Sequence, residues 1–224
     1  MSRALVLRHH LEDDAGLIGT ALSSLGYSLR TVLVNETHRA PELDAEDIVI
    51  ILGSTSSVYD ESVQAAWLNH EVDLVRIADQ QAVPVLGICF GAQVLCHAFG
   101  GRVELAPESE IGWTEIEVRS GIDLESGPWF EYHADRCVLP TDATVWASSS
   151  RAVQAFTIGK HLGVQFHPEI DDEQLARWFA SPSDVPRAHD DREEELLEET
   201  RRQTPSATIR AAHLVDLFLA HCRQ

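Results

Sequence analysis

The first half of the chain alternates short apolar runs with amphipathic helical patterns, and this alternation constrains its fold more than any other feature. The apolar runs lie at Ala4–Leu7, Leu29–Val34, Ile48–Leu52 and Val83–Ile88. Between them, apolar residues recur at helical spacing over residues 15–25 and 61–81. Repeated strand–helix–strand units with uninterrupted apolar strands are typical of a parallel sheet that is covered by helices on both faces.

The second half contains shorter strand-like runs between turn residues, at residues 102–105, 113–118, around 138, 144–147, 152–158 and 161–166. These runs predict antiparallel strands and hairpins that extend the sheet. We therefore expect an α/β fold with one doubly wound, mostly parallel, flavodoxin-like sheet and an antiparallel extension. A length of 224 residues suits a single domain over residues 1–224 and is short for two.

The C-terminal part changes composition. Residues 181–206 are rich in Pro, Asp, Glu and Arg, which favours a solvated acidic loop or helix. Thr204-Pro205 is typical of a helix start, because Pro is tolerated at the first helical position. We expect an amphipathic final helix over residues 207–222.

Composition excludes several classes of function. Lys and Arg total 17 against 36 Asp and Glu, for a formal net charge of −19, so binding to nucleic acid or to an anionic membrane surface is disfavoured. Unbroken apolar stretches stay far below the ~18 residues of a membrane span, and the first apolar run is too short for a signal peptide. The four cysteines lack Cys-x-x-Cys spacing, which favours free thiols in the cytoplasm.

A cysteine stands directly after the fourth apolar run, in Val85-Leu-Gly-Ile-Cys-Phe-Gly-Ala-Gln-Val-Leu95. Gly87 and Gly91 flank Cys89 at two residues on either side, as a sharp strand-to-helix turn requires. Such a nucleophile elbow raises the side chain above the carboxyl ends of the strands. The start of the following helix favours the thiolate form. A buried structural cysteine is the alternative for this segment taken alone.

A second segment, Leu162-Gly-Val-Gln-Phe-His-Pro-Glu-Ile170, strengthens the catalytic interpretation. The run ends at His167, Pro168 stops the strand, and Glu169 lies close enough for a turn to bring its carboxylate to the imidazole. Cys89, His167 and Glu169 would then act as nucleophile, base and orienting acid.

The segments Gly87-Ile-Cys-Phe-Gly-Ala-Gln93 and Gln165-Phe-His-Pro-Glu169 resemble the class I (triad-type) glutamine amidotransferases, in particular the free-standing relatives of the GMP-synthetase glutaminase domain. The resemblance implies hydrolysis of the glutamine side-chain amide through a γ-glutamyl thioester on Cys89. The family passes the ammonia to a synthetase. The chain lacks a Ser-Gly-Gly-x-Asp-Ser loop and a Gly-x-x-x-x-Gly-Lys-Ser/Thr motif, so either a separate synthetase uses the ammonia or the protein acts alone.

The resemblance also implies a substrate site. The oxyanion hole would use the N–H groups of Ser54 and Phe90, with Gly53 allowing close approach. Ser54 replaces a glycine of the family pattern and Thr55 replaces a proline. Gln93, one helical turn after the cysteine, would meet the substrate.

The segment Tyr132-His133-Ala134-Asp135 stands where the family carries Ser-His-Gly-Asp. Tyr132 and His133 would therefore line the part of the pocket that holds the α-amino and α-carboxylate groups, with His133 mainly positional.

Two alternatives remain open. The same Cys-His-Glu arrangement resembles γ-glutamyl hydrolases and peptidases, which act on larger γ-glutamyl amides, and the chain could also be a regulatory subunit with little activity. No metal or other cofactor is expected. His9 and His10 stand near the end of the first strand and could approach the site, although a surface position is favoured.

Overall fold

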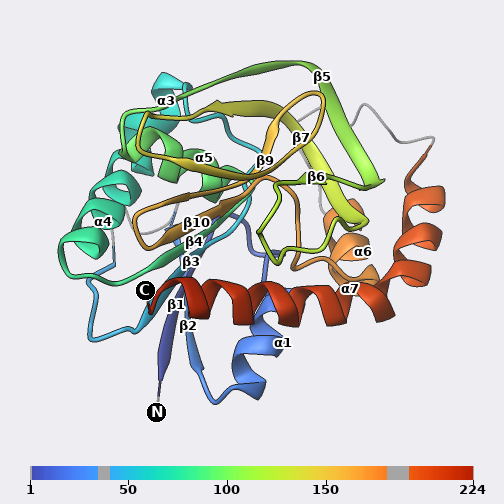
Figure 1. Ribbon diagram of the computed structural model, residues 1–224, viewed down its shortest axis with the longest axis horizontal. Helices are drawn as coiled ribbons and strands as arrows, with labels where there is room; N and C mark the ends of the chain where they lie inside the picture. The colour runs from blue at the N-terminus through green and yellow to red at the C-terminus, as the bar shows by residue number, and fades with distance from the viewer. Residues whose placement is uncertain (1, 35–40, 181–191, 224) are drawn as a thin grey trace.

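The computed structural model describes residues 2–34, 41–180 and 192–223 of the chain. Its centre is a sheet whose eight described strands follow the order β2-β1-β3-β4-β10-β9-β8-β6 (Figure 1). The strands are β1 (Arg3–Arg8), β2 (Ser28–Leu33), β3 (Ile48–Ile51), β4 (Val85–Ile88), β6 (Glu117–Val118), β8 (Thr144–Ser148), β9 (Val153–Ile158) and β10 (His161–Val164).

Strands β2, β1, β3, β4 and β10 are parallel neighbours, whereas β9, β8 and β6 add antiparallel pairs at one edge. The expected α/β fold, with a mostly parallel sheet and an antiparallel extension, is confirmed. Every residue of β3, β4 and β10 is buried, as expected for central strands that are covered on both faces.

Helices cover both faces of the sheet. Helix α1 (Gly16–Ser24) and helix α7 (Glu193–His221) pack together over the face that carries Ala4 and Val6. On the other face, α4 (Asn69–Gln80) and α5 (Phe90–Ala98) cover Leu5 and Leu7. Alternate residues of one strand thus enter opposite halves of the core.

The helical pattern over residues 61–81 is confirmed, but it folds as three consecutive helical pieces. These are α3 (Glu61–Val63), the π-helix η1 (Gln64–Leu68) and α4. The Asp60 side chain caps the start by accepting the Ser62 backbone N–H at 2.8 Å. The π turn rotates the following residues relative to an ideal α-helix.

Strands β5 (Arg102–Thr114) and β7 (Trp129–Val138) form a separate antiparallel ribbon, seen at the top right of Figure 1. We expected the runs at residues 102–105 and around 138 to extend the main sheet, and this was wrong. A bridge between Phe130 and His167 joins the ribbon to the chain after β10.

In the part of the chain that the structure describes after His167, α6 (Asp172–Ala180) precedes α7. We expected the last helix to begin at Thr204-Pro205, but α7 begins at Glu193 and contains Pro205. Buried residues lie on both sides of the proline, at Leu196 and Ala211 among others. Continuous packing of this face outweighs the ~3 kcal/mol that an interior proline costs a helix.

Residues 181–191 of the expected acidic segment lie outside the described residues. The single-domain organisation stays a prediction.

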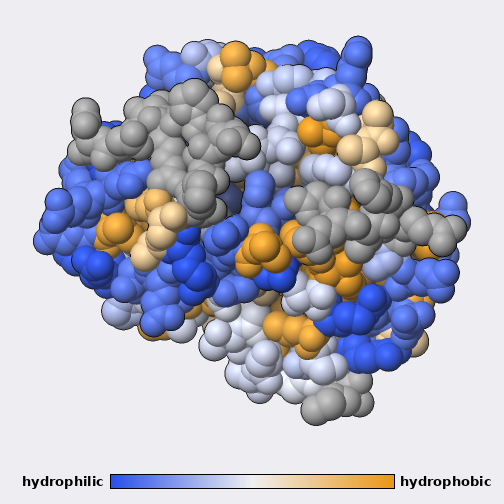
Figure 2. Space-filling view, turned by 180° about the vertical axis from the view of Figure 1, so that it is seen from behind, coloured by the Kyte–Doolittle hydropathy of each residue, from blue (hydrophilic) through white to orange (hydrophobic). Residues whose placement is uncertain are grey.

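The face seen from behind is mainly hydrophilic, with separate apolar patches (Figure 2). None of the described helices is long and apolar enough to cross a membrane. Within the described ranges, no group of three or more His, Cys, Asp and Glu side chains is arranged to hold a metal ion.

Candidate active site

Cys89 occupies the junction between β4 and α5. Its backbone has φ 51° and ψ −105°, in a region that non-glycine residues rarely adopt. Its N–H donates to the Val164 carbonyl of β10 at 2.8 Å, and its own carbonyl accepts the Gln93 N–H at 3.1 Å. These bonds hold the turn between strand and helix in a strained conformation.

The two flanking glycines let this turn close. A Cβ atom on Gly87 would lie 2.4 Å from the Gly91 carbonyl oxygen, and a Cβ on Gly91 would lie 2.1 Å from the Ile51 carbonyl oxygen. Both distances are far shorter than a carbon–oxygen contact allows. The start of α5 therefore packs against β3 and β4 only because these two residues lack side chains.

His167 and Glu169 lie together just after β10. His167 Nδ1 is 2.7 Å from Glu169 Oε1, and both side chains are buried. The His167 backbone N–H donates to the Phe130 carbonyl at 2.8 Å, and the Trp178 ring lies edge-on to the imidazole, with 5.1 Å between centroids. The His167 imidazole is therefore fixed by the end of β10, by the β5–β7 ribbon and by helix α6.

The Glu169 backbone is held as well as its side chain. Its carbonyl accepts the N–H of Leu17 at 2.9 Å, at the start of α1. Gly16 lies so close that a Cβ there would be 2.0 Å from the same oxygen. The first helix thereby fixes the turn that carries the carboxylate.

The pKa of His167 lies well above its usual range. Burial lowers the pKa, but the charges of Glu169 and Cys89 and the hydrogen bond to Glu169 outweigh that effect. His167 Nε2, the ring nitrogen that does not contact Glu169, makes no hydrogen bond to another described residue. The arrangement favours an imidazolium beside Cys89.

Gln165 also contacts the cysteine, a role that the resemblance did not assign to it. Its Nε2 is 3.5 Å from Cys89 Sγ, and its Oε1 accepts from Gln93 Nε2 at 3.4 Å. Gln93, expected to meet substrate, is thus buried and orients Gln165. The spacing of Gln165 and His167, two residues apart at a strand end, could have indicated that both face the same way.

Gly53 lies against both catalytic candidates. A Cβ there would be 3.0 Å from His167 Cε1 and 3.8 Å from Cys89 Cβ. Ser54 follows it and is half-buried, and its Oγ accepts the Ser56 N–H at 3.2 Å. Phe90 is buried at the first position of α5. The residues expected around an oxyanion therefore flank the thiol on two different segments.

Behind Gly53 lies His9, which is buried and whose Nδ1 is 2.8 Å from the Gly53 carbonyl oxygen. The favoured surface position was wrong for His9. His10 is partly exposed and contacts the Thr55 hydroxyl at 3.2 Å. The parallel pairing of β1 with β3 brings these residues together.

Tyr132 and His133 lie on β7. The half-buried Tyr132 ring stacks on Phe130, with 6.2 Å between centroids, and contacts Trp178 at 6.3 Å. It therefore shares an aromatic cluster with a ring that touches His167.

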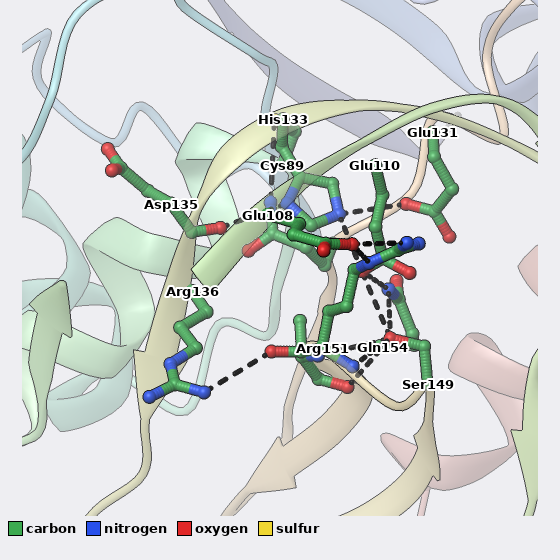
Figure 3. A network of polar contacts seen from close by, with 12 residues as sticks. Cys89, Glu108, Glu110, Glu131, His133, Asp135, Arg136, Ser149, Arg151 and Gln154 are labelled. Carbon is green, nitrogen blue, oxygen red and sulfur yellow. Dashed lines mark hydrogen bonds and ion pairs between the residues drawn. The ribbon is translucent and has the colours of Figure 1, made fainter. Parts of the chain in front are cut away.

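His133 instead faces a buried acidic network on the β5–β7 ribbon (Figure 3). Its Nδ1 donates to the Asp135 carbonyl at 2.9 Å, and its Nε2 is 3.1 Å from Glu131 and 3.4 Å from Glu110. Glu110 also accepts from Gln154 at 2.9 Å. Burial raises the pKa of Glu131 above its usual range, although His133 opposes this shift.

Curated relatives resemble part of the chain. A GMP synthase (glutamine-hydrolyzing) of Rhizobium rhizogenes is 36% identical over 134 residues, which cover 54% of this chain and 24% of the relative. The enzyme of the same name from Corynebacterium efficiens is 34% identical over 130 residues, with 54% and 23% covered. The matched part is thus about a quarter of the length of these relatives.

Solved structures match nearly the whole chain. A glutamine amidotransferase from Thermotoga maritima has a TM-score of 0.83 at 25% identity, covering 97% of this chain and 98% of that protein. A putative GMP synthase subunit from Thermoplasma acidophilum shares the fold, with a TM-score of 0.63 at 24% identity and coverage of 92% and 98%. The family model for class I glutamine amidotransferases matches residues 16–177. The chain belongs to the class I glutamine amidotransferase family.

Proposed function

We propose that this protein hydrolyses the side-chain amide of glutamine to glutamate and ammonia, with Cys89 as nucleophile. The observation that carries the proposal is the junction of β4 and α5, where Cys89 at φ 51° stands beside a His167–Glu169 pair joined at 2.7 Å. A raised pKa of His167, caused by Glu169 and Cys89 against the effect of burial, suits an imidazolium that pairs with a thiolate.

In the proposed reaction, the Cys89 thiolate attacks the carboxamide carbon of glutamine and the carbonyl oxygen becomes an oxyanion. His167 donates its proton to the amide nitrogen and the carbon–nitrogen bond breaks. Ammonia departs, and a γ-glutamyl thioester of Cys89 remains. A water molecule then attacks the thioester while His167 accepts its proton. Glutamate departs and Cys89 is regenerated as the thiolate.

The backbone N–H groups of Ser54 and Phe90 are the proposed oxyanion donors. Gly53, within reach of both His167 and Cys89, gives the substrate room on that side. Loss of one such donor typically raises a barrier by about 2.7–4 kcal/mol. The Gln165 amide, 3.5 Å from the sulfur, would stabilise the thiolate before attack.

We further propose that a separate synthetase uses the ammonia. A protein of the same fold is described as a subunit of a putative GMP synthase, which supports a synthetase on a separate polypeptide. A reducing cytoplasm is the proposed location, since all four cysteines are free thiols.

Larger γ-glutamyl amides are the second candidate substrate class. Tyr132 replaces the serine of the family pattern, and its half-buried ring lies beside Trp178, which contacts His167. Such an aromatic surface could pack against the amine part of a larger substrate.

The test is release of ammonia and glutamate from glutamine by the purified chain, beside Cys89→Ala and a panel of γ-glutamyl amides. Release from glutamine that disappears in the variant supports the proposal. Turnover restricted to larger amides would move the assignment to a γ-glutamyl hydrolase. Silence on every substrate, with Cys89 no more reactive towards a glutamine-like electrophile than the other cysteines, would leave a regulatory subunit.

A further inference from the structure

His9 connects the end of β1 to the segment that follows β3. The two strands are parallel neighbours with Leu7 opposite Ile51, so His9 and Gly53 stand at matching positions two residues beyond that pair. The His9 side chain is 1% exposed, and its Nδ1 is 2.8 Å from the Gly53 carbonyl oxygen. Because a carbonyl oxygen can only accept, Nδ1 carries the hydrogen of this bond.

Glu71 of α4 holds the opposite nitrogen of the ring. Its Oε1 is 3.1 Å from His9 Nε2, and Glu71 is fully buried. Burial lowers the pKa of His9, but Glu71 and the Gly53 carbonyl together raise it above its usual value, with a further contribution from Asp13. The ring is therefore fixed at both nitrogens and favours the doubly protonated form.

The faces of the same ring are fixed by aromatic contacts. The Trp67 ring lies 4.9 Å away between centroids and the Phe90 ring lies 5.1 Å away. Phe90 is also the residue whose backbone N–H is one proposed oxyanion donor. His9 thus touches both segments from which the oxyanion donors come.

The bond to Gly53 determines where the next N–H points. The Gly53 carbonyl and the Ser54 N–H belong to one planar peptide unit, and in a trans unit they point in opposite directions. With the carbonyl held towards His9, the Ser54 N–H is directed away from His9. A charged donor on the carbonyl also polarises the peptide and strengthens its N–H as a donor.

We propose that His9, held by Glu71, is a positioning residue that orients and polarises the Gly53–Ser54 peptide as half of the oxyanion hole. This inference rests on the glutamine hydrolysis proposed above. A buried His–Glu pair adds little net stability, because desolvation offsets its attraction. The main effect of the pair is therefore expected in the reaction.

The first test is steady-state kinetics of glutamine hydrolysis. His9→Leu is expected to lower kcat by about 10²–10³-fold, the loss seen when an oxyanion donor is removed, with KM nearly unchanged. His9→Asn keeps a neutral N–H donor in place of Nδ1 and is expected to restore kcat to about one tenth of the parent value, the level also expected when the pair carries no charge. Glu71→Gln removes the carboxylate charge, so that His9 is paired with a neutral amide. This variant is expected to lower kcat about tenfold, the difference between a charged and a neutral hydrogen bond.

His161→Asn is the matched control. His161 is also 1% exposed, accepts the Val85 N–H at 3.0 Å and lies 3.2 Å from Asp79, at the start of β10 and away from Cys89. It is expected to lower thermal stability without changing kcat. Alkylation of Cys89 by iodoacetamide, which forms no oxyanion, should keep its rate in His9→Leu. A folded His9→Leu with kcat within about threefold of the parent, or with alkylation falling in parallel with kcat, overturns the inference.

The second test does not depend on activity. Gly53-Ser54 is the only Gly-Ser pair in the sequence, so labelling glycine with carbonyl ¹³C and serine with ¹⁵N gives a single correlated NMR signal from this peptide. The signal is expected to shift in His9→Leu and in Glu71→Gln but not in His161→Asn. If His9→Leu does not fold, Glu71→Gln decides by the same signal.

An unshifted signal overturns the inference whatever the kinetics show. If the parent protein fails to hydrolyse glutamine, the proposed function fails on that result alone. The NMR signal then still decides whether His9 controls the Gly53–Ser54 peptide.

Discussion

At the scale of single residues, the site depends on groups that leave one another little freedom. Cys89 has a backbone conformation that costs about 1–3 kcal/mol, and the hydrogen bond to Val164 and the glycines on either side maintain it. Its partner His167 has a raised pKa because of Glu169 and Cys89, in spite of burial. The carboxylate therefore sets the charge of the imidazole as well as its orientation.

Replacing Glu169 with Gln should lower kcat by about 10²–10⁴-fold. Removing a charge that raises the pKa of His167 lowers that pKa, so the imidazolium loses its proton at lower pH. The alkaline limb of the kcat/KM profile should move to lower pH in Glu169→Gln and stay in place in Glu173→Gln, an exposed carboxylate on α6. An unmoved limb would show that Glu169 does not set the protonation of His167.

At the scale of helices and strands, α7 carries much of one core face. Phe218 is fully buried against the sheet, whereas Ile209 on the same helix is 69% exposed. Phe218→Ala should lower the free energy of unfolding by about 3–5 kcal/mol through lost burial and a cavity. Ile209→Ala should change it by less than about 0.5 kcal/mol. Denaturant unfolding of both variants measures this difference, and equal losses would contradict the packing described for α7.

Features that depend on a local sequence pattern could be predicted, whereas features that depend on packing between distant segments could not. The strand that ends at Ile88, the Gly87–Gly91 spacing around Cys89 and the short separation of His167 from Glu169 are local patterns. The course of α7 through Pro205 was missed because packing on both sides outweighs local propensity.

The burial of His9 was missed for a related reason. It depends on which strands are neighbours in the sheet, and β1 lies beside β3 although they are distant in sequence. No spacing within one segment indicates that His9 contacts Gly53.

At the scale of the whole molecule, a net charge of −19 accompanies a mainly hydrophilic face on the side seen in Figure 2, yet several carboxylates are buried. Glu131 of β7 is fully buried and lies 3.1 Å from His133, which also contacts Glu110. Burial raises its pKa, while His133 and His167 oppose the shift. This group therefore makes overall stability depend on pH.

A raised pKa means that the folded state binds this proton more tightly than the unfolded state. Stability from Glu131 is present below its unfolded pKa and is lost as pH rises towards the folded value. Glu131→Gln should remove that loss, so its free energy of unfolding should gain on the parent as pH rises above the usual glutamate range. Denaturant unfolding between about pH 4.5 and pH 8 would show this. The exposed Glu117→Gln should run parallel to the parent, and a parallel Glu131→Gln would refute the expectation.

The crowding at Gly16, Gly87 and Gly91 limits which mutations the gene can tolerate. An added Cβ at these positions would lie 2.0–2.4 Å from a backbone oxygen. Every other amino acid carries a Cβ, so each missense change at these three codons places an atom against the main chain, which cannot move aside as a side chain can. In a population of randomly mutated genes selected for a working enzyme, these codons should survive almost solely through synonymous changes. Substitutions should accumulate instead at Gly26, Gly100 and Gly121, where an added Cβ has open space and the positive φ of these turns is the main cost.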